Sequence, residues 1–312
     1  TTGHPTCQTD NQQRQGKLFM TATVTSLPLA EPKRDRYGRY LLPHPDTGKE
    51  QPWTRVTTIA STTADRFGLE AWAQRNTVLG IGLRPDLYAL AVSSTVDDRQ
   101  QLTRVVKQAQ EAAKASSGAN LGTALHRITE RSDRGEEVDV PAEWKGDVYA
   151  YHQTLADHHV TIHSDWIERI VVLPELGIAG TLDRLVTLAG QAAMTVADLK
   201  TGKDVVKYGT TEIAIQLALY ANATHVWNGD GYDPMPPTNT DKGLIIHLPV
   251  GKAECNLHTV DIAAGWETVQ LALAVREWRK RKDLTAPYSI LDQAENMLKP
   301  VNTPKPVNDD DW

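Results

Sequence analysis

Two aspartates and a lysine near the middle of the chain have a spacing that would gather them into one cluster. Segments 181–188 and 193–199 are rich in β-branched residues and flank a glycine, which favours two strands joined by a short turn. Because side chains alternate along a strand, Asp198 and Lys200 would point to the same side. A hairpin would bring Asp183 beside Asp198, so the sequence predicts two carboxylates and one ammonium group on one face.

Carboxylates gathered in this way bind hard divalent cations. Mg²⁺ and Mn²⁺ prefer oxygen ligands, and Mg²⁺ usually keeps several of its water molecules. Without a cation, two neighbouring aspartates would repel each other. Such a metal polarises a phosphate and lowers the pKa of its bound water, while a nearby lysine orients that water or stabilises charge on the phosphate. The cluster therefore predicts Mg²⁺ or Mn²⁺ as cofactor and phosphodiester hydrolysis as the chemistry.

A histidine upstream of the two strands extends the candidate cluster. His126 lies in segment 121–132, whose apolar spacing predicts a helix. Glu130 follows four residues later and would lie on the same helical face, where it could support a metal-binding histidine. His126 is therefore a candidate member of the cluster, with Glu130 as a candidate supporting partner.

Three more polar residues lie on the elements around the two strands. Glu168 belongs to segment 163–173, a further expected strand. Gln216 and Tyr220 are four residues apart in segment 211–227, an expected helix, and so would share one helical face. All three could turn toward the cluster from neighbouring elements.

Each of these residues also has an ordinary structural interpretation. Asp183 could pair with its neighbour Arg184, and Lys200 could be a solvated residue at a strand end. His126 could pack among its apolar neighbours, and Gln216 could merely cover a helix flank. It is the order of all the elements along the chain, more than any single one, that favours chemistry.

That order resembles a known family of nucleases. The sequences GTLDR at 180–184 and VADLKTGK at 196–203 resemble the motifs of the RecB-like exonuclease branch of the PD-(D/E)XK superfamily, where G-x-x-D on one strand precedes D-x-K-T on the next. GTALH at 122–126 is similar to the family's upstream G-x-x-x-H helix, and QLALY at 216–220 to its downstream Q-x-x-x-Y helix. The resemblance covers about residues 120–225. Leu182 stands where the superfamily name has proline, as is normal in this branch.

The resemblance implies a role for each matching residue. It makes Asp183 and Asp198 catalytic metal ligands and Lys200 the residue that acts on the attacking water. It adds three metal ligands or supporting groups, namely His126, the backbone carbonyl of Leu199, and Glu168. It also implies that Gln216 and Tyr220 position the substrate strand.

The implied function is a metal-dependent deoxyribonuclease. A nuclease of this branch without a helicase motor is similar to phage-type recombination exonucleases, which resect duplex ends in recombination or repair. The expected partners are then DNA, as duplex ends or single strands, a single-strand annealing or binding protein, and further copies of the chain. The alternatives are a structure-specific endonuclease and a catalytically inactive DNA-end-binding protein, although the intact Asp–Asp–Lys set argues against the latter.

Composition limits the classes of protein that fit. The net charge of −6 over 312 residues excludes a uniformly basic nucleic-acid binder, so phosphate contacts must come from local clusters of Lys and Arg. The two cysteines, Cys7 and Cys255, include no C-x-x-C pair, which excludes a four-cysteine zinc or iron–sulfur site within the chain. No apolar run is long enough to span a bilayer, so we expect no membrane contact and a cytoplasmic location, in a bacterial host if the protein is phage-encoded.

The expected fold class is α/β or α+β, with a central mixed sheet flanked by helices and a restriction-endonuclease-like core. Strands are expected at 163–173, 181–188, 193–199, 243–249 and 255–260. Helix starts are expected at Thr62 and Thr95, each followed by an acidic residue three positions later. Four parts are expected along the chain, namely an irregular segment 1–50, a helical elaboration 51–118, a nuclease core 119–290 and a disordered acidic tail 291–312.

Overall fold

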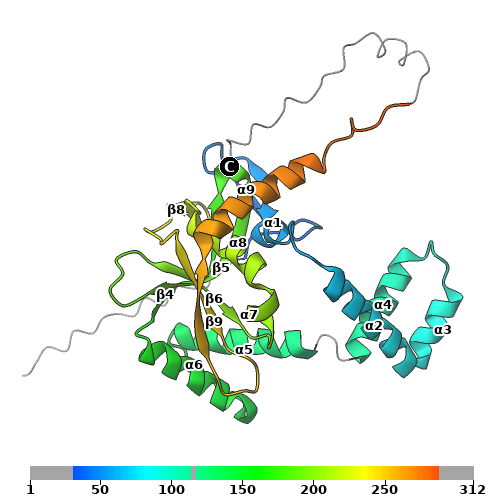
Figure 1. Ribbon diagram of the computed structural model, residues 1–312, viewed down its shortest axis with the longest axis horizontal. Helices are drawn as coiled ribbons and strands as arrows, with labels where there is room; N and C mark the ends of the chain where they lie inside the picture. Colours follow the sequence, from blue (N-terminus) through cyan, green and yellow to red (C-terminus); the bar gives the residue numbers. More distant parts are fainter. Residues whose placement is uncertain (1–30, 114–116, 288–312) are drawn as a thin grey trace, which may run out of the picture.

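A large mixed β-sheet forms the centre of the molecule. The computed structural model describes residues 31–113 and 117–287, and for 117–120 the backbone alone. Within these residues eight strands form one sheet, seven of them in a continuous path (Figure 1). In spatial order that path is β10 (Asn256–Asp261), β9 (Lys242–His247), β6 (Thr195–Lys200), β5 (Ile178–Thr187), β4 (Thr161–Leu173), β7 (His225–Trp227) and β8 (Tyr232–Pro234).

Most neighbouring strands in this sheet are antiparallel, and two pairings are parallel. Strand β6 runs parallel to β9, and the short β3 (Thr54–Arg55) runs parallel to the beginning of β5. The parallel β6–β9 pairing requires a crossover, which α7 (Val205–Tyr208) and α8 (Thr210–Ala221) provide. The predicted α/β class, with a large mixed sheet flanked by helices, is therefore confirmed.

Helices cover both faces of the sheet, so its central strands are buried on both sides. Helix α8 packs with α1 (Val56–Ala60) and α9 (Ile262–Trp278) in one apolar cluster, which includes Val196 of β6. Helices α5 (Ser117–Asp133) and α6 (Lys145–Asp157) contribute to the cluster on the other face, which includes Ala197. The alternation of Val196 and Ala197 between the two clusters is the period of two expected of a strand.

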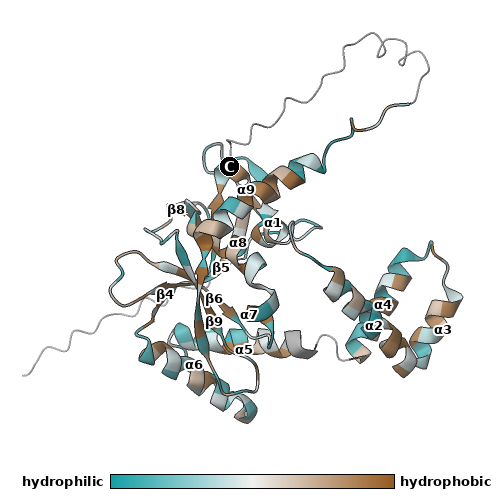
Figure 2. Cartoon of the chain, viewed as in Figure 1, coloured by the Kyte–Doolittle hydropathy of each residue, from teal (hydrophilic) through white to brown (hydrophobic). Residues whose placement is uncertain are grey.

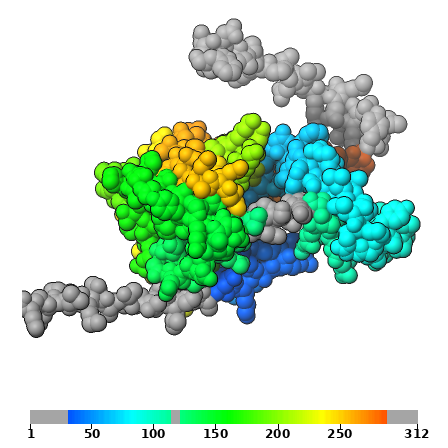
Figure 3. Space-filling view, turned by 90° about the horizontal axis from the view of Figure 1, so that it is seen from below, coloured from blue at the N-terminus to red at the C-terminus, as the bar shows by residue number. Residues whose placement is uncertain are grey.

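A bundle of three helices forms a separate lobe beside the sheet (Figure 3). It consists of α2 (Phe67–Leu83), α3 (Pro85–Ser93) and α4 (Arg99–Ala112) and has its own small core of Leu87, Val105 and Ala109. A Cβ atom on Gly80 of α2 would clash with the backbone of Ala109, so a glycine is needed where α2 crosses α4. Large apolar side chains remain exposed on this lobe, among them Phe67, Leu79, Leu83 and Tyr88. Figure 2 shows hydrophobic residues along its three helices.

The predicted parts of the chain divide differently in the structure. Within the expected helical segment 51–118, α1 belongs to the core, whereas α2, α3 and α4 form the separate lobe. Within the expected irregular segment 1–50, β1 (Leu41–Pro43) pairs with β2 (Glu50–Pro52) in a hairpin. Residues 1–30 and the predicted acidic tail, 291–312, lie outside the described residues.

Two predicted helix starts are wrong by four or five residues. The hydroxyl of Thr62 donates to the carbonyl of Thr58 and so closes the end of α1, and the next helix, α2, begins at Phe67. The carboxylate of Asp98 accepts the backbone N–H and the hydroxyl of Thr95, which fixes a turn that precedes α4. The polar side chains do form local bonds, but in turns outside the helices.

The predicted helix 211–227 is also too long. Helix α8 ends at Ala221, and His225, Val226 and Trp227 form strand β7, which pairs with β4. Pairing of these residues with β4 and β8 outweighs the helical tendency of the preceding residues. In the described part of the chain, no helix combines the length and apolar character needed to cross a membrane.

Candidate metal centre

Asp183 lies where strands β5 and β6 separate. Their backbone pairing runs from Val186–Thr195 to Arg184–Ala197 and stops there. Beyond that point the Oδ2 atom of Asp183 accepts the backbone N–H of Leu199 at 3.0 Å. The carboxylate thus takes the place of a backbone acceptor in the ladder, and its position is fixed by the sheet itself.

Asp198 and Lys200 share one side of β6, as their spacing predicts. Asp198 is 1 % exposed, and its Oδ2 lies 2.5 Å from Nζ of Lys200. Burial and the charge of Asp183 raise the pKa of Asp198 to about 6, although Lys200 opposes this shift. Burial lowers the pKa of Lys200, but the charges of Asp198 and Asp183 outweigh it and raise the pKa above its usual value. Lys200 is therefore held as an ammonium group.

Gln216 reaches the same carboxylate from helix α8 and also contacts Tyr220, one turn later on that helix. Nε2 of Gln216 donates to Oδ1 of Asp198 at 3.2 Å and to the hydroxyl oxygen of Tyr220 at 3.4 Å. Tyr220 is 3 % exposed, and burial holds its pKa well above the usual value. In this structure the two residues hold Asp198 in place.

His126 approaches the two strands from helix α5. Its Nε2 lies 3.1 Å from the carbonyl oxygen of Leu199 and 3.1 Å from Oδ2 of Asp183, while its Nδ1 lies 2.8 Å from Oε1 of Glu130. Burial lowers the pKa of His126, but the hydrogen bonds to Asp183 and Glu130 outweigh it and raise the pKa to about 10. The bond with His126 in turn outweighs the burial of Asp183 and lowers the pKa of that carboxyl to about 2.

Glu168 lies on strand β4, next to the β5 strand that carries Asp183. The register of β4 and β5 places it opposite Asp183. Its φ angle is +54°, a left-handed conformation that is unfavourable for glutamate and that recurs at functional sites. Glu168 faces solvent in the pocket. Even so, desolvation there, followed by the charges of Asp183 and Glu130, raises its pKa to about 8.

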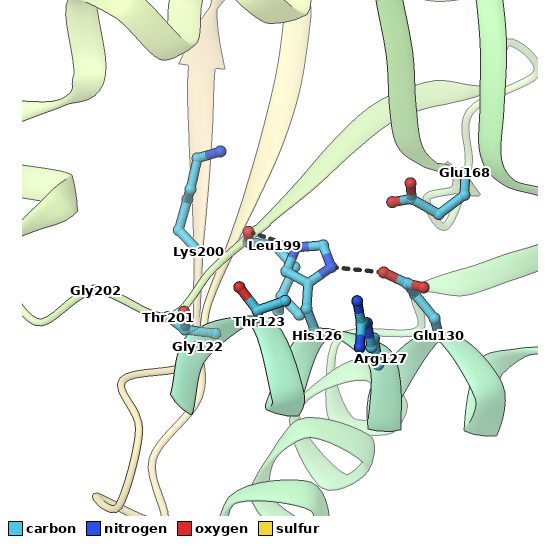
Figure 4. A pocket seen from close by; sticks show the side chains of 10 residues that line it. All are labelled: Gly122, Thr123, His126, Arg127, Glu130, Glu168, Leu199, Lys200, Thr201 and Gly202. Atoms are coloured by element: carbon cyan, nitrogen blue, oxygen red, sulfur yellow. Dashed lines mark hydrogen bonds and ion pairs between the residues drawn. The ribbon is translucent and has the colours of Figure 1, made fainter. Parts of the chain in front are cut away.

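His126, Glu130, Glu168 and Lys200 border one pocket of about 480 Å³ (Figure 4). Helix α5 forms one wall, and the end of β6 with the loop at Thr201 and Gly202 forms another. One ligand atom each from His126, Glu130 and Glu168 lies within 4.8 Å of the others, a spacing that could hold a metal ion. The structure therefore adds Glu130 to the candidate ligands.

The donor set fits a hard divalent cation. Carboxylate oxygens dominate it, with one imidazole nitrogen and the carbonyl of Leu199, the ligand types that Mg²⁺ and Mn²⁺ accept. Four carboxylates (Asp183, Asp198, Glu130 and Glu168) lie with three nearby cations, namely Lys200, the protonated His126 and Arg127. The raised pKa values of Asp198 and Glu168 express this excess of negative charge.

Two motif glycines allow the walls of the site to meet closely. A Cβ atom on Gly122 would clash with Oγ1 of Thr201, so α5 passes directly against the loop that follows β6. A Cβ atom on Gly180 would lie 2.6 Å from Cγ2 of Val56 and 2.9 Å from the ring of Tyr220. Each glycine keeps a site residue, His126 or Asp183, close to its partners.

A second ionic cluster lies on the far side of β5. Nε of Arg184, a fully buried residue, donates to Oδ2 of Asp133 at 2.7 Å, and one terminal nitrogen donates to the hydroxyl of Thr129 at 2.9 Å. The hydroxyl of Tyr151 donates to the same Asp133 oxygen at 2.7 Å. Arg184 therefore pairs with Asp133 of α5, and the network joins β5 to α5 and α6.

The sequence alone pointed to Asp183, Asp198, Lys200, His126, Gln216 and Tyr220, and the structure brings all six together with Glu168. The sequence alone did not reveal Arg127, which also lines the pocket, or the Thr129–Asp133–Arg184 network. The spacing of Thr129 and Asp133, four residues apart on α5, was an available signal for the latter. No protein-family model matches the chain, and no curated protein matches its sequence.

Proposed function

We propose that the protein is a metal-dependent deoxyribonuclease of the PD-(D/E)XK type that hydrolyses phosphodiester bonds. The observation that carries this proposal is the convergence of Asp183, Asp198 and Lys200 with His126, beside a pocket that Glu130 and Glu168 also line. An excess of carboxylates held in place by a sheet has no evident structural benefit, because each unpaired charge costs stability. It is explained by binding a divalent cation.

Asp183, Asp198, Glu130, Glu168, His126 and the carbonyl of Leu199 are the groups that would hold Mg²⁺ or Mn²⁺. A bound ion of this kind polarises a phosphate and makes its bound water more acidic. His126 must lose a proton to serve as a ligand, and its bonds to Asp183 and Glu130 keep that proton until a cation replaces it.

Lys200 is placed to act on the reacting groups. The ion pair with the buried Asp198 fixes its ammonium group beside the carboxylates. From there it can donate to an attacking water or to a phosphate oxygen, and so stabilise the negative charge that develops there. Gln216 keeps Asp198 in the orientation that this pairing needs.

Within this function we propose an exonuclease that resects duplex ends, with Mg²⁺ or Mn²⁺ as cofactor, in phage recombination or repair. This choice, and that of DNA over RNA, rests on the resemblance of the motifs to the RecB-like branch. A structure-specific endonuclease and an inactive end-binding protein remain the alternatives. Partnership with a single-strand annealing or binding protein, and a homo-oligomeric state, belong to the same proposal.

The test is digestion of end-labelled linear duplex DNA beside a covalently closed circle, with Mg²⁺ or Mn²⁺. We expect loss of the linear DNA alone, and no activity from Lys200→Ala. Lys49→Ala, which removes an exposed lysine of the β1–β2 hairpin, is the matched control and should keep full activity.

Cleavage of the circle as well would identify an endonuclease. Absence of cleavage with either metal, or full activity of Lys200→Ala, would refute the proposed site. Binding of DNA ends without cleavage would then favour the inactive end-binding protein.

A further inference from the structure

The charged groups around the pocket differ in whether they have partners. Lys200 pairs with Asp198, and His126 bonds to Glu130 and Asp183. Arg127 lines the same pocket and is exposed, yet it makes no hydrogen bond or ion pair with any residue in the described ranges 31–113 and 117–287. It is the pocket-lining cation whose donors are still available to a ligand.

Helix α5 places Arg127 on the same face as the candidate metal ligands (Figure 4). At about 100° per residue, Thr123, His126, Arg127 and Glu130 all fall within an arc of about 100°. Arg127 lies at one edge of this arc and His126 at the other. A molecule seated against the ligands would therefore lie beside the Arg127 guanidinium as well.

The neighbouring carboxylate does not pair with Arg127. Glu130, three residues later, is within reach of an i,i+3 pair, but its Oε1 lies 2.8 Å from Nδ1 of His126. The next arginines on this stretch behave differently, since Nε of Arg131 donates to Glu136 at 2.7 Å and Arg134 reaches the carbonyl of Ile167. Arg127 alone of these three keeps all its donors free among the described residues.

An anionic substrate needs such a group here. The protein carries a net charge of −6, and two carboxylates, Glu130 and Glu168, line the pocket, so a nucleic-acid strand is repelled unless cations flank the metal site. Arginine presents five donors in a planar fork that matches two phosphate oxygens, and it stays charged at any working pH. A solvated helix arginine is the ordinary alternative, and Arg131 shows what that looks like on the same helix.

We propose that Arg127 binds a backbone phosphate next to the scissile one, and that it holds the strand across the metal site. This inference rests on the proposed function, because it assigns a contact within the same substrate. An arginine in this role contributes equally to the bound substrate and the transition state, so its loss raises KM and leaves kcat nearly unchanged.

The test measures binding apart from cleavage. A fluorescent duplex oligonucleotide is titrated with Lys200→Ala protein in Ca²⁺, and anisotropy is followed over a range of salt concentrations. Adding Arg127→Ala should weaken binding and reduce the slope of log K against log salt by about one, as expected for loss of one phosphate contact. Arg127→Lys should keep the slope and part of the affinity, and Arg131→Ala should change neither.

Cleavage kinetics supply the second readout. In the otherwise native protein, Arg127→Ala should raise KM several-fold at unchanged kcat. If the native protein cleaves DNA while Arg127→Ala keeps the native KM and salt slope, the inference fails and the proposed function stands. If DNA binds with an Arg127-dependent slope but is not cleaved, the phosphate contact of Arg127 stands, whereas its place beside a scissile phosphate fails together with the nuclease function. Absence of DNA binding overturns both.

Discussion

Adjacent residues of strand β5 belong to two ionic clusters with opposite properties. Arg184 enters a buried network in which Asp133 balances its charge. The hydroxyls of Thr129 and Tyr151 add one hydrogen bond each, to Arg184 and to Asp133. Asp183 enters a cluster in which negative groups outnumber positive ones and two carboxyl pKa values are raised. A balanced cluster serves the fold, whereas we propose that the unbalanced one is completed by a cation.

The largest effect is expected from breaking the balanced cluster. Arg184→Met should destabilise the protein by about 3–5 kcal/mol, because Asp133 would be left buried without its partner. The measurement is urea unfolding in EDTA. Asp133→Leu should cost a similar amount, and the double variant should cost less than the sum of the two.

Arg131→Ala, which removes an exposed pair with Glu136, is the control and should leave the unfolding midpoint in place. If Arg184→Met costs less than about 1 kcal/mol, the distinction between the two clusters is not one of charge balance.

A smaller effect is expected from the unbalanced cluster, and it should depend on metal. Saturating Mn²⁺, at about 100 times its Kd, should stabilise the native protein by roughly 2.7 kcal/mol. Asp198→Asn should remove most of this gain and all cleavage, yet cost little stability in EDTA, since it removes one of two neighbouring carboxylates. Unfolding curves with and without Mn²⁺ measure both. Equal metal stabilisation of the variant would place the ion elsewhere.

The smallest effect is a pH dependence of the metal-free protein's stability. The affinity for metal should change with pH in the opposite direction. The pKa of His126 is raised from 6.5 to about 10 on folding, so its contribution to stability is complete below pH 6.5 and is lost as pH rises toward 10. Asp198, with its pKa raised from 3.8 to about 6, adds a loss of stability as pH rises from about 4 to 6. Asp183, with its pKa lowered to about 2, acts in the opposite direction only below pH 4.

Urea unfolding in EDTA at pH 7 and 9 tests this dependence. Stability should fall between the two, and His126→Asn should flatten the change. Metal affinity should instead rise over the same range, because His126 must be deprotonated to bind. Metal-free stability that increases with pH would contradict the assigned bonds of His126.

The positions of the charged residues could be predicted from the sequence where local periodicity determines them. Alternation along β6 was sufficient to place Asp198 and Lys200 on one side, and the hairpin placed Asp183 near them. The left-handed backbone of Glu168 has no local signal, because it depends on how β4 meets β5. The partner of Arg184 had only the spacing of Thr129 and Asp133 as a local signal, because the packing of two helices on the sheet decides the contact.

The bond between Asp183 and the Leu199 amide has a practical consequence. Because that N–H donates to a carboxylate at the edge of the candidate metal site, its nuclear magnetic resonance frequency depends on the charge that the carboxylate carries. An isotopic label at Leu199, on the buried strand β6, would thus give one signal that moves when a cation binds to Asp183. Occupancy of the site could be followed in this way without any substrate and without turnover.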